Sequence, residues 1–338
     1  MSAIVGSRPG MEDRWNVALH SQGHAAIFAV YDGHGGSQVS TYLMENLSQT
    51  ILQDPTLLSD PVGALKRSFA TCDHAATEEN PKRNPLSSSP GPGSTAVVLL
   101  ILPPRLFVAN VGDSRATFVN RDGEIVFETV DQRPTCPTEI SRLRDLGGVI
   151  RCVNGVTRVS GILAVSRAFG NAGLKQFIKA EPEVTDIDLD KIDTCIVCSD
   201  GVTDVVDSPE AVDFLLRSSQ RSSAYSSAHA MDPVDQNGRK QEHRWHEKRM
   251  SGHFLDGEPD KFSAISLLGP NNGRGAAKRL TTLAKTRHST DNITALLLSV
   301  SKRTSAACGY NLRSRQKSPS DMDSNKDIKR SRTDACKT

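Results

Sequence analysis

Long hydrophobic runs are missing from this chain. The longest one, Ala96–Leu102, covers seven residues. A membrane-spanning helix needs roughly 20 consecutive apolar residues, so we expect no membrane span. The N-terminus also lacks the basic and apolar pattern of a secretory signal. We therefore expect an intracellular protein, located in the cytoplasm, the nucleus or both.

Cysteine is scarce as well. Seven cysteines are spread irregularly over 338 residues. An odd number with no dense framework argues against a disulfide-stabilised secreted domain and favours a reducing compartment. Cys195 and Cys198 form one CxxC pair inside an apolar run, so packing in the core explains them better than zinc binding or redox chemistry.

Net charge is small but unevenly distributed. The formal charge is +2. Residues 217–287 carry thirteen Lys and Arg against seven Asp and Glu, and residues 302–338 carry ten against four. Each region therefore holds +6, which leaves −10 for the rest of the chain. Since the folded surface of a nucleic-acid binder is normally basic, we expect no nucleic-acid binding.

Two segments lack hydrophobic periodicity. Serine, glycine, histidine and charged residues dominate residues 218–275, and residues 303–338 are similar. We predict a domain over residues 1–302, interrupted by a disordered basic insertion at about 218–275 and followed by a disordered basic tail over 303–338. The charge of the insertion suggests an acidic partner, and we expect the chain to be a monomer.

The remaining sequence contains many strands and few helices. Apolar runs and turn signals predict strands over 25–31, 95–102, 106–111, 115–119, 124–130, 162–165, 195–198 and 292–300, and a hairpin over 149–158. Helical spacing and capping signals predict helices over 36–53, 61–79, 137–147 and 278–285, and one that begins at Ser208. Strands joined by tight hairpins form antiparallel sheets whose outer faces helices must cover, so we predict an α+β layered sandwich.

Carboxylates recur where strands end or turn. Five segments carry them: Glu12-Asp13, Asp32, Asp131, Asp200 and Asp291. Strand ends of a layered sandwich can converge at one rim, where gathered carboxylates repel one another unless a counter-ion is present. Oxygen ligands favour Mg²⁺ or Mn²⁺ over zinc. Glycine at position 33 lets the backbone approach an ion closely, so its carbonyl is a further candidate ligand.

Taken singly, these motifs are weak signals, because an Asp-Gly pair is usually a turn. Asp32, followed by His34 and two glycines, is a stronger one. The segment Gly112-Asp113-Ser114-Arg115 lies between two predicted strands. We interpret it as a tight turn with a local hydrogen bond rather than as a catalytic segment.

Together, the motifs resemble a known family. In chain order they cover residues Arg8–Asp13, Asp32–Gly36, Gly93–Ala96, Val111–Arg115, Asp131–Pro134, Val165–Gly170, Glu181–Val184, Ser199–Val205 and Asp291–Thr294. This order is similar to that of the type 2C, or PPM, family of protein phosphatases. The resemblance runs from about residue 5 to residue 300 and is interrupted by the predicted insertion.

The resemblance implies a four-layer α-β-β-α sandwich of two antiparallel sheets flanked by helices. It implies a protein serine/threonine phosphatase that acts on phosphoproteins. The attacking water would be activated by two Mn²⁺ or Mg²⁺ ions. None of the cysteines lies in a phosphate-binding loop pattern, which argues against a cysteine-based phosphatase.

Roles for single residues also follow from the resemblance. Asp32 would bridge the two ions, the Gly33 carbonyl would bind one of them, and Asp200 and Asp291 would bind the other. Glu12 and Asp13 would hold metal-bound waters, and Asp131, sharing Asp200, would bind a weaker third ion. Arg8 would grip two phosphate oxygens at once, and His34 would act as the general acid.

One departure from the family pattern is Asn171, where relatives usually have Asp. We expect it to affect the local loop more than activity. Two alternatives stay open at this point: a catalytically weak relative that acts as a phosphoprotein-binding regulatory module, and a metal hydrolase of small phosphate compounds.

Overall fold

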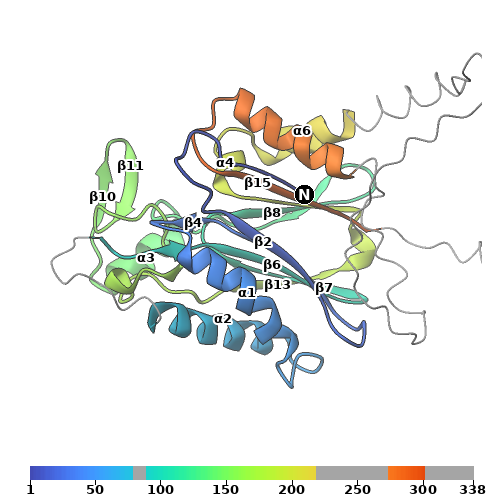
Figure 1. The fold of residues 1–338 in the computed structure, drawn as a ribbon, viewed down its shortest axis with the longest axis horizontal. Helices are drawn as coiled ribbons and strands as arrows, with labels where there is room; N and C mark the ends of the chain where they lie inside the picture. Colours follow the sequence, from blue (N-terminus) through green and yellow to red (C-terminus); the bar gives the residue numbers. More distant parts are fainter. Residues whose placement is uncertain (79–88, 218–272, 301–338) are drawn as a thin grey trace, which may run out of the picture. The chain divides into compact units, whose positions relative to one another are not determined.

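The computed structural model describes residues 1–78, 89–217 and 273–300 (Figure 1). The predicted tail lies outside these residues, and so does the predicted insertion apart from residues 273–275. No helix in the described residues is long and apolar enough to cross a membrane. The described part of the chain consists of two large sheets, two small ones and the helices that cover them.

The first large sheet has five antiparallel strands in the order β13-β7-β6-β3-β2. Their bounds are β2 Arg14–Leu19, β3 Ala26–Tyr31, β6 Ala96–Leu102, β7 Arg105–Val111 and β13 Glu183–Asp188. The inner strands β3 and β6 are apolar along almost their whole length because both faces of the sheet are covered.

The second large sheet has the order β1-β15-β14-β8-β9 and is also antiparallel. Its bounds are β1 Ser2–Ile4, β8 Arg115–Val119, β9 Ile125–Glu128, β14 Thr194–Cys198 and β15 Ile293–Ser299. The predicted core positions of Cys195 and Cys198 are confirmed, since both are free and buried in the central strand β14.

Helices cover the outer faces of both sheets. The structure has α1 Gln38–Leu52, α2 Pro61–Glu78, α3 Pro137–Asp145, α4 Asp200–Thr203, a helix over 208–217, α6 Gly273–Thr286, and 3-10 helices at Ala172–Leu174 and Leu189–Lys191. Figure 1 shows α1 and α2 on one side of the paired sheets and α4 and α6 on the other. The buried residues of α1, among them Leu43 and Leu47, recur at helical spacing.

Three apolar cores establish the layers. Successive residues of β3 point to opposite faces of the sheet. Phe28 lies in the core between the two sheets, together with Phe118 of β8 and Leu298 of β15. Ile27 lies in the core under α1 and α2, and a third core lies between the second sheet and the helices that include Leu280 of α6. This arrangement confirms the predicted α+β sandwich of two antiparallel sheets flanked by helices.

Short strands lie near the ends of the large sheets. A three-stranded sheet has the order β12-β5-β4, with β4 Gly33–His34, β5 Gly93–Ser94 and β12 Phe169–Gly170. The predicted hairpin is present as β10 Ile150–Val153 and β11 Val156–Val159. The predicted strand over 162–165 is wrong: only a single bridge, Val159 to Leu163, forms there. Leu163 and Val165 instead pack in a small separate core beside α3.

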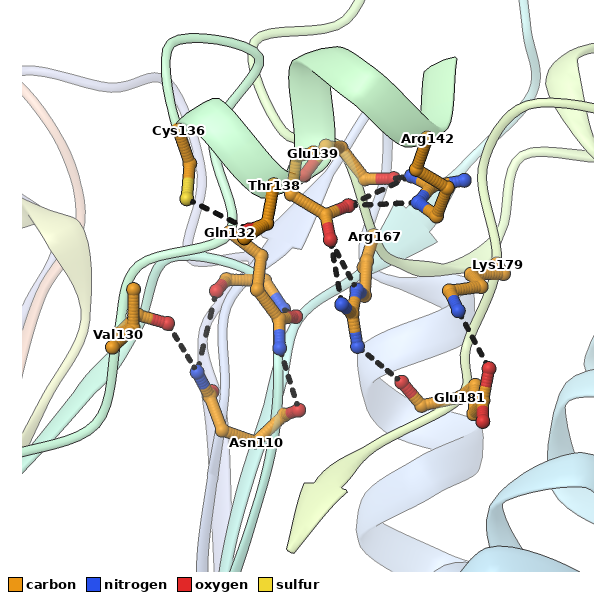
Figure 2. Close-up of polar contacts among 12 residues, drawn as sticks. Asn110, Val130, Gln132, Cys136, Thr138, Glu139, Arg142, Arg167, Lys179 and Glu181 are labelled. Atoms are coloured by element: carbon orange, nitrogen blue, oxygen red, sulfur yellow. Dashed lines mark hydrogen bonds and ion pairs between the residues drawn. The ribbon is translucent and has the colours of Figure 1, made fainter. Parts of the chain in front are cut away.

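A buried ion triad attaches α3 to the segment that follows β11. The Glu139 carboxylate accepts hydrogen bonds from Arg142 Nη2 at 2.8 Å and from Arg167 Nη2 at 2.5 Å (Figure 2). Arg142 also donates to the carbonyl oxygens of Ser166 and Phe177, each at 2.8 Å. Burial alone would raise the pKa of Glu139, but the hydrogen bonds and charges of the two arginines outweigh it and hold the pKa at about 2.

We expect Glu139→Gln to lower the free energy of unfolding by about 3 kcal/mol at neutral pH, because it breaks a buried charge network. The folded pKa of Glu139, about 2, lies below its ordinary value of 4.5. The stabilisation is therefore present above pH 4.5 and is lost as the pH falls toward 2. Urea unfolding at several pH values measures both effects.

The matched control is Glu181→Gln, whose partner Lys179 lies 2.6 Å away in an exposed pair. It should change stability by no more than about 1 kcal/mol. A Glu139→Gln protein as stable as the wild type at neutral pH would contradict the assigned role of the triad.

Candidate metal centre

Strand pairing in the second sheet brings two of the predicted ligands to one rim. Asp200 begins α4 directly after β14, and Asp291 lies shortly before β15. The two strands are antiparallel neighbours, with Cys198 paired to Ala295. The end of β14 therefore lies beside the start of β15, and the two carboxylates share that end of the sheet.

The first sheet supplies the other carboxylates. Asp32 directly follows β3, and Glu12 and Asp13 directly precede β2. Because Arg14 at the start of β2 pairs with Tyr31 at the end of β3, these acidic residues also share one end of their sheet. Strands far apart in the sequence thus deliver their carboxylates to one region.

Close backbone contacts hold the loops together at this rim. A Cβ at Gly201 would lie 1.9 Å from the Asn292 carbonyl oxygen, and a Cβ at Gly6 would lie 1.9 Å from the Asp291 carbonyl oxygen. Gly6 also has a φ of +68°, a conformation that favours glycine. Glycine at both positions lets the loop before Arg8 and the turn after Asp200 contact the same backbone segment.

The Asn292 side chain fixes the N-terminal loop, a role that the sequence did not indicate. Its Oδ1 accepts a hydrogen bond from the Glu12 backbone N–H at 2.7 Å. Its Nδ2 donates to the carbonyl oxygens of Val5 at 2.8 Å and Gly10 at 3.0 Å. One amide therefore joins the loop that carries Arg8 and Glu12 to the start of β15.

Asp13 is buried between the two sheets. Its Oδ2 accepts hydrogen bonds from Thr294 Oγ1 at 2.7 Å and from Ser199 Oγ at 3.0 Å. Burial and, to a smaller extent, the charge of Asp291 raise the pKa of Asp13, the hydroxyl donors Thr294 and Ser199 lower it, and the net pKa is about 6. Asp13 is therefore held rigidly beside the candidate ligands.

Asp32 and Asp200 lie close enough to other carboxylates to feel their charge. Burial, followed by the charges of Asp13, Asp200 and Asp113, raises the pKa of Asp32 well above its usual range. Burial also raises the pKa of Asp200, and the charges of Asp113, Asp291 and Asp204 add to this. The predicted ligands Asp32, Asp200 and Asp291 are thus brought together with Asp13.

The donor set fits a hard divalent cation. Asp13 Oδ1 and Asp200 Oδ1 are buried and have no hydrogen-bond partner. Buried carboxylate oxygens without donors are stabilised by a cation, and oxygen donors suit Mg²⁺ or Mn²⁺. Among the described residues, no three His, Cys, Asp or Glu side chains are already arranged as a metal site.

Arg8 contacts a candidate ligand directly. Its Nη2 lies 2.6 Å from Asp291 Oδ2, and the Arg8 side chain is more than half exposed. The guanidinium therefore lies at the solvent side of the carboxylate cluster. An anion that reached the rim would meet Arg8, which must exchange its Asp291 partner in order to bind that anion with two donors.

Gly33 is enclosed by other elements. A Cβ at this position would lie 2.5 Å from the Glu12 carbonyl oxygen and 2.6 Å from Ser40 Oγ. The Ser40 hydroxyl in turn donates to the Glu12 carbonyl oxygen. Only glycine fits between α1 and the acidic N-terminal loop, so the backbone after Asp32 stays close to the carboxylate cluster.

His34 hydrogen-bonds to Asn171, the position at which the sequence departs from the family pattern. His34 Nε2 lies 2.9 Å from Asn171 Oδ1, and Asn171 Nδ2 donates to the Gly91 carbonyl oxygen at 3.0 Å. Since Asn171 Nδ2 is engaged, its Oδ1 is the acceptor and His34 Nε2 carries the hydrogen. Burial lowers the pKa of His34, whereas the Asn171 hydrogen bond and the charge of Glu12 raise it.

Asp131 lies in a different environment from the other candidates. Its carboxylate is bound by both ends of the Arg115 guanidinium, with Nε 3.0 Å from Oδ1 and Nη2 2.8 Å from Oδ2. Both of its oxygens therefore already have a cationic partner, and its role as a ligand stays a prediction.

The buried carboxylate beside Asp200 is Asp113, which we interpreted from the sequence as part of a plain turn. Asp113 is almost fully buried, and burial raises its pKa to about 6, although the charge of Arg133 lowers it. The sequence shows no signal for this, because an Asp-Ser turn between two strands is a common local pattern.

Comparisons with known proteins agree with this geometry. A family model described as "Protein phosphatase 2C" matches residues 1–244. The chain is 36% identical over 217 residues to "Probable protein phosphatase 2C 56" of Oryza sativa subsp. japonica, which covers 63% of this chain and 60% of that protein. It is 38% identical over 211 residues to "Probable protein phosphatase 2C 45" of the same species, which covers 62% of this chain and 72% of that protein.

A third relative, "Probable protein phosphatase 2C 76" of Arabidopsis thaliana, is 38% identical over 210 residues, 61% of this chain and 48% of that protein. The chain thus spans about half to three quarters of the length of these relatives. A solved phosphatase from Toxoplasma gondii superposes with a TM-score of 0.65 at 21% identity, covering 89% of this chain and 91% of that one. This likeness establishes the shared fold.

We expect Gly201→Ala to destabilise the domain by about 2 kcal/mol or more, because the added Cβ meets the Asn292 backbone and must push β14 and β15 apart at the rim. Gly10→Ala is the matched control in the neighbouring loop, since a Cβ there would have nothing within 4 Å. Thermal unfolding measures both. Equal melting temperatures for the two variants would show that the close contact at Gly201 does not hold the rim.

Proposed function

The chain belongs to the protein phosphatase 2C family, and on this basis we propose that it is a metal-dependent protein serine/threonine phosphatase. Its substrates are phosphoserine and phosphothreonine side chains of other proteins. The observation that carries the proposal is the convergence of Asp13, Asp32, Asp200 and Asp291 at one rim, with two buried carboxylate oxygens that lack donors.

Two Mn²⁺ or Mg²⁺ ions are the cofactors of the proposed reaction. Asp32 and the Gly33 carbonyl would hold one ion, Asp32, Asp200 and Asp291 would hold the other, and Glu12 and Asp13 would hold metal-bound waters. When bound, the ions supply an activated water at neutral pH and positive charge for the phosphoryl oxygens. The anchoring of Asp13 by Thr294 and Ser199 supports this assignment, because a rigid carboxylate can hold a water in a fixed direction.

Arg8 orients the substrate in this proposal. Its exposed guanidinium, already beside Asp291, binds two phosphate oxygens with parallel hydrogen bonds. Because Asp291 is also a proposed ligand, Arg8 and a bound ion would compete for this carboxylate. Ion binding and phosphate binding would then be coupled through the Arg8 side chain.

His34 donates the proton to the departing serine or threonine oxygen. The Asn171 carboxamide accepts from Nε2–H and so fixes the direction of the imidazole ring. Burial lowers the pKa of His34, and the Asn171 hydrogen bond and the charge of Glu12 partly oppose this by favouring the protonated form. The position of His34 next to Gly33 in β4 supports the assignment, since it places the ring near the proposed ions.

We expect Asp200→Asn to weaken Mn²⁺ binding and turnover of a phosphopeptide by at least roughly 100-fold, because it removes charge from the shared ligand of the centre. The matched control is Asp122→Asn in the exposed turn between β8 and β9, which should behave as the wild type. Titration calorimetry with Mn²⁺ and phosphate release measure the two effects.

Turnover that survives chelation of divalent ions would sink the metal-dependent mechanism. A wild-type chain that binds phosphopeptides but shows no turnover with Mn²⁺ or Mg²⁺ would identify the alternative, a regulatory binding module. Faster hydrolysis of small phosphate compounds than of phosphopeptides would indicate a metabolite hydrolase.

A second prediction isolates the general acid. We expect His34→Gln to slow hydrolysis of a phosphoserine peptide by about 100-fold or more, since the alkoxide leaving group needs a proton. The same variant should lose much less activity on p-nitrophenyl phosphate, whose leaving group is stable without protonation. Equal losses on both substrates would mean that His34 acts in some way other than proton donation.

A further inference from the structure

A guanidinium lies inside the acidic cluster beside Asp200. Arg133 Nη2 lies 2.6 Å from Asp204 Oδ1, and Arg133 Nε lies 3.0 Å from Asp113 Oδ2 and 3.7 Å from Asp131 Oδ2. Although Nε is close to Asp113, it is buried and has no hydrogen-bond partner. The contact with Asp113 is therefore an ion pair without a hydrogen bond.

The carboxylates around Arg133 are continuous with the proposed metal centre. Asp113 and Asp204 are among the groups whose negative charges act on Asp200. They come from the turn after β7 and from the end of α4, so separate elements converge on the guanidinium. Without Arg133, this would be a cluster of unpaired acidic side chains around Asp200.

The arrangement does not fit the third ion that the family resemblance implied. Asp131, the expected ligand, is bound at both oxygens by Arg115. Asp113 and Asp204, whose charges act on Asp200, both already have Arg133 as a cationic partner. A guanidinium is always charged and is attached to the chain, so a dissolved cation can replace it only by displacing the whole side chain.

We propose that Arg133 is a built-in counter-ion that takes the place of a further divalent cation between Asp113, Asp200 and Asp204. The proposal rests on the proposed metal centre and sets its stoichiometry: the chain binds two ions and no third. The proposal also predicts that the cluster becomes a cation-binding site in a variant that lacks the Arg133 guanidinium. Arg133 and Asp131 line an open hollow of about 460 Å³, and the side chain of Asp204 is half exposed, so ions from solvent can reach the carboxylates that contact Arg133.

The test counts bound Mn²⁺ ions per chain by equilibrium dialysis with metal analysis. We expect Arg133→Gln to bind one ion more than the wild type, because the substitution removes the charge and leaves the carboxylates. Arg133→Lys keeps a cation and should bind the same number as the wild type. Arg115→Gln removes an equal charge from the neighbouring ion pair with Asp131 and should also match the wild type.

A second measurement does not depend on the folding of the Arg133 variants. In the wild-type background, Asp204→Asn should leave the number of bound ions unchanged, because Asp204 faces a guanidinium and not an ion.

Thermal unfolding gives a further comparison for Arg133→Gln. Added Mn²⁺ should stabilise this variant more than it stabilises the wild type, since ligand binding to an extra site of the folded state raises the melting temperature.

Two results would overturn the proposal. One is equal ion numbers for Arg133→Gln and the wild type. The other is the loss of one ion from the wild-type chain on Asp204→Asn, which would place an ion where we place the guanidinium. A wild-type chain that binds no Mn²⁺ would instead refute the proposed metal centre, and the difference between Arg133→Gln and wild type would still decide the role of Arg133.

Discussion

Mutual repulsion between buried carboxylates is the constraint on which the rest of this structure depends. Burial raises the pKa values of Asp13, Asp32 and Asp200, and the charges of Asp13, Asp200 and Asp291 each raise the pKa of a neighbour further. They stay together because strand pairing and tight backbone contacts leave them no room to separate. The apolar cores on the two sides of each sheet supply the stability that this crowding costs. A cation bound at the rim, as proposed above, would relieve the repulsion and make the proximity of these charges favourable.

Much of the fold could be predicted from the sequence because its inner strands are apolar and end in recognisable turns. β3, β6 and β14 are uninterrupted apolar runs, and two of them lead directly to Asp32 and to Asp200. The edge strands β2 and β13 gave no such signal, because every second residue of β2 is exposed and β13 carries acidic side chains. The apolar run at Ile162–Val165 gave a false strand prediction: Leu163 and Val165 pack in a local core, but only the single bridge from Leu163 to Val159 forms.

The candidate site was likewise predicted only in part from the sequence. Acidic residues at strand ends could be recognised because the local sequence places them directly beside apolar runs. Strand pairing then brings these strand ends together. The contributions of Asp113, Asn292 and Arg133 could not, because each depends on partners that are distant in the sequence. Asn171 shows the same limit. Its φ of 51° and its donation to the Gly91 carbonyl oxygen use properties of asparagine, since a carboxylate at this position would have no N–H to donate.

The position of residues 218–272 in the sequence, between two helices of the outer layer, affects which parts of this chain can vary in length. The helix over 208–217 precedes residues 218–272 and α6 follows them, and both helices pack on the outer face of the second sheet. The acidic rim is built from other connections, at the ends of β3, β14 and β15. Sequence gained or lost between these two helices therefore need not alter the spacing of the carboxylates. Sequence between the two helices can thus evolve independently of the acidic rim, whose geometry is set by strand pairing elsewhere in the chain.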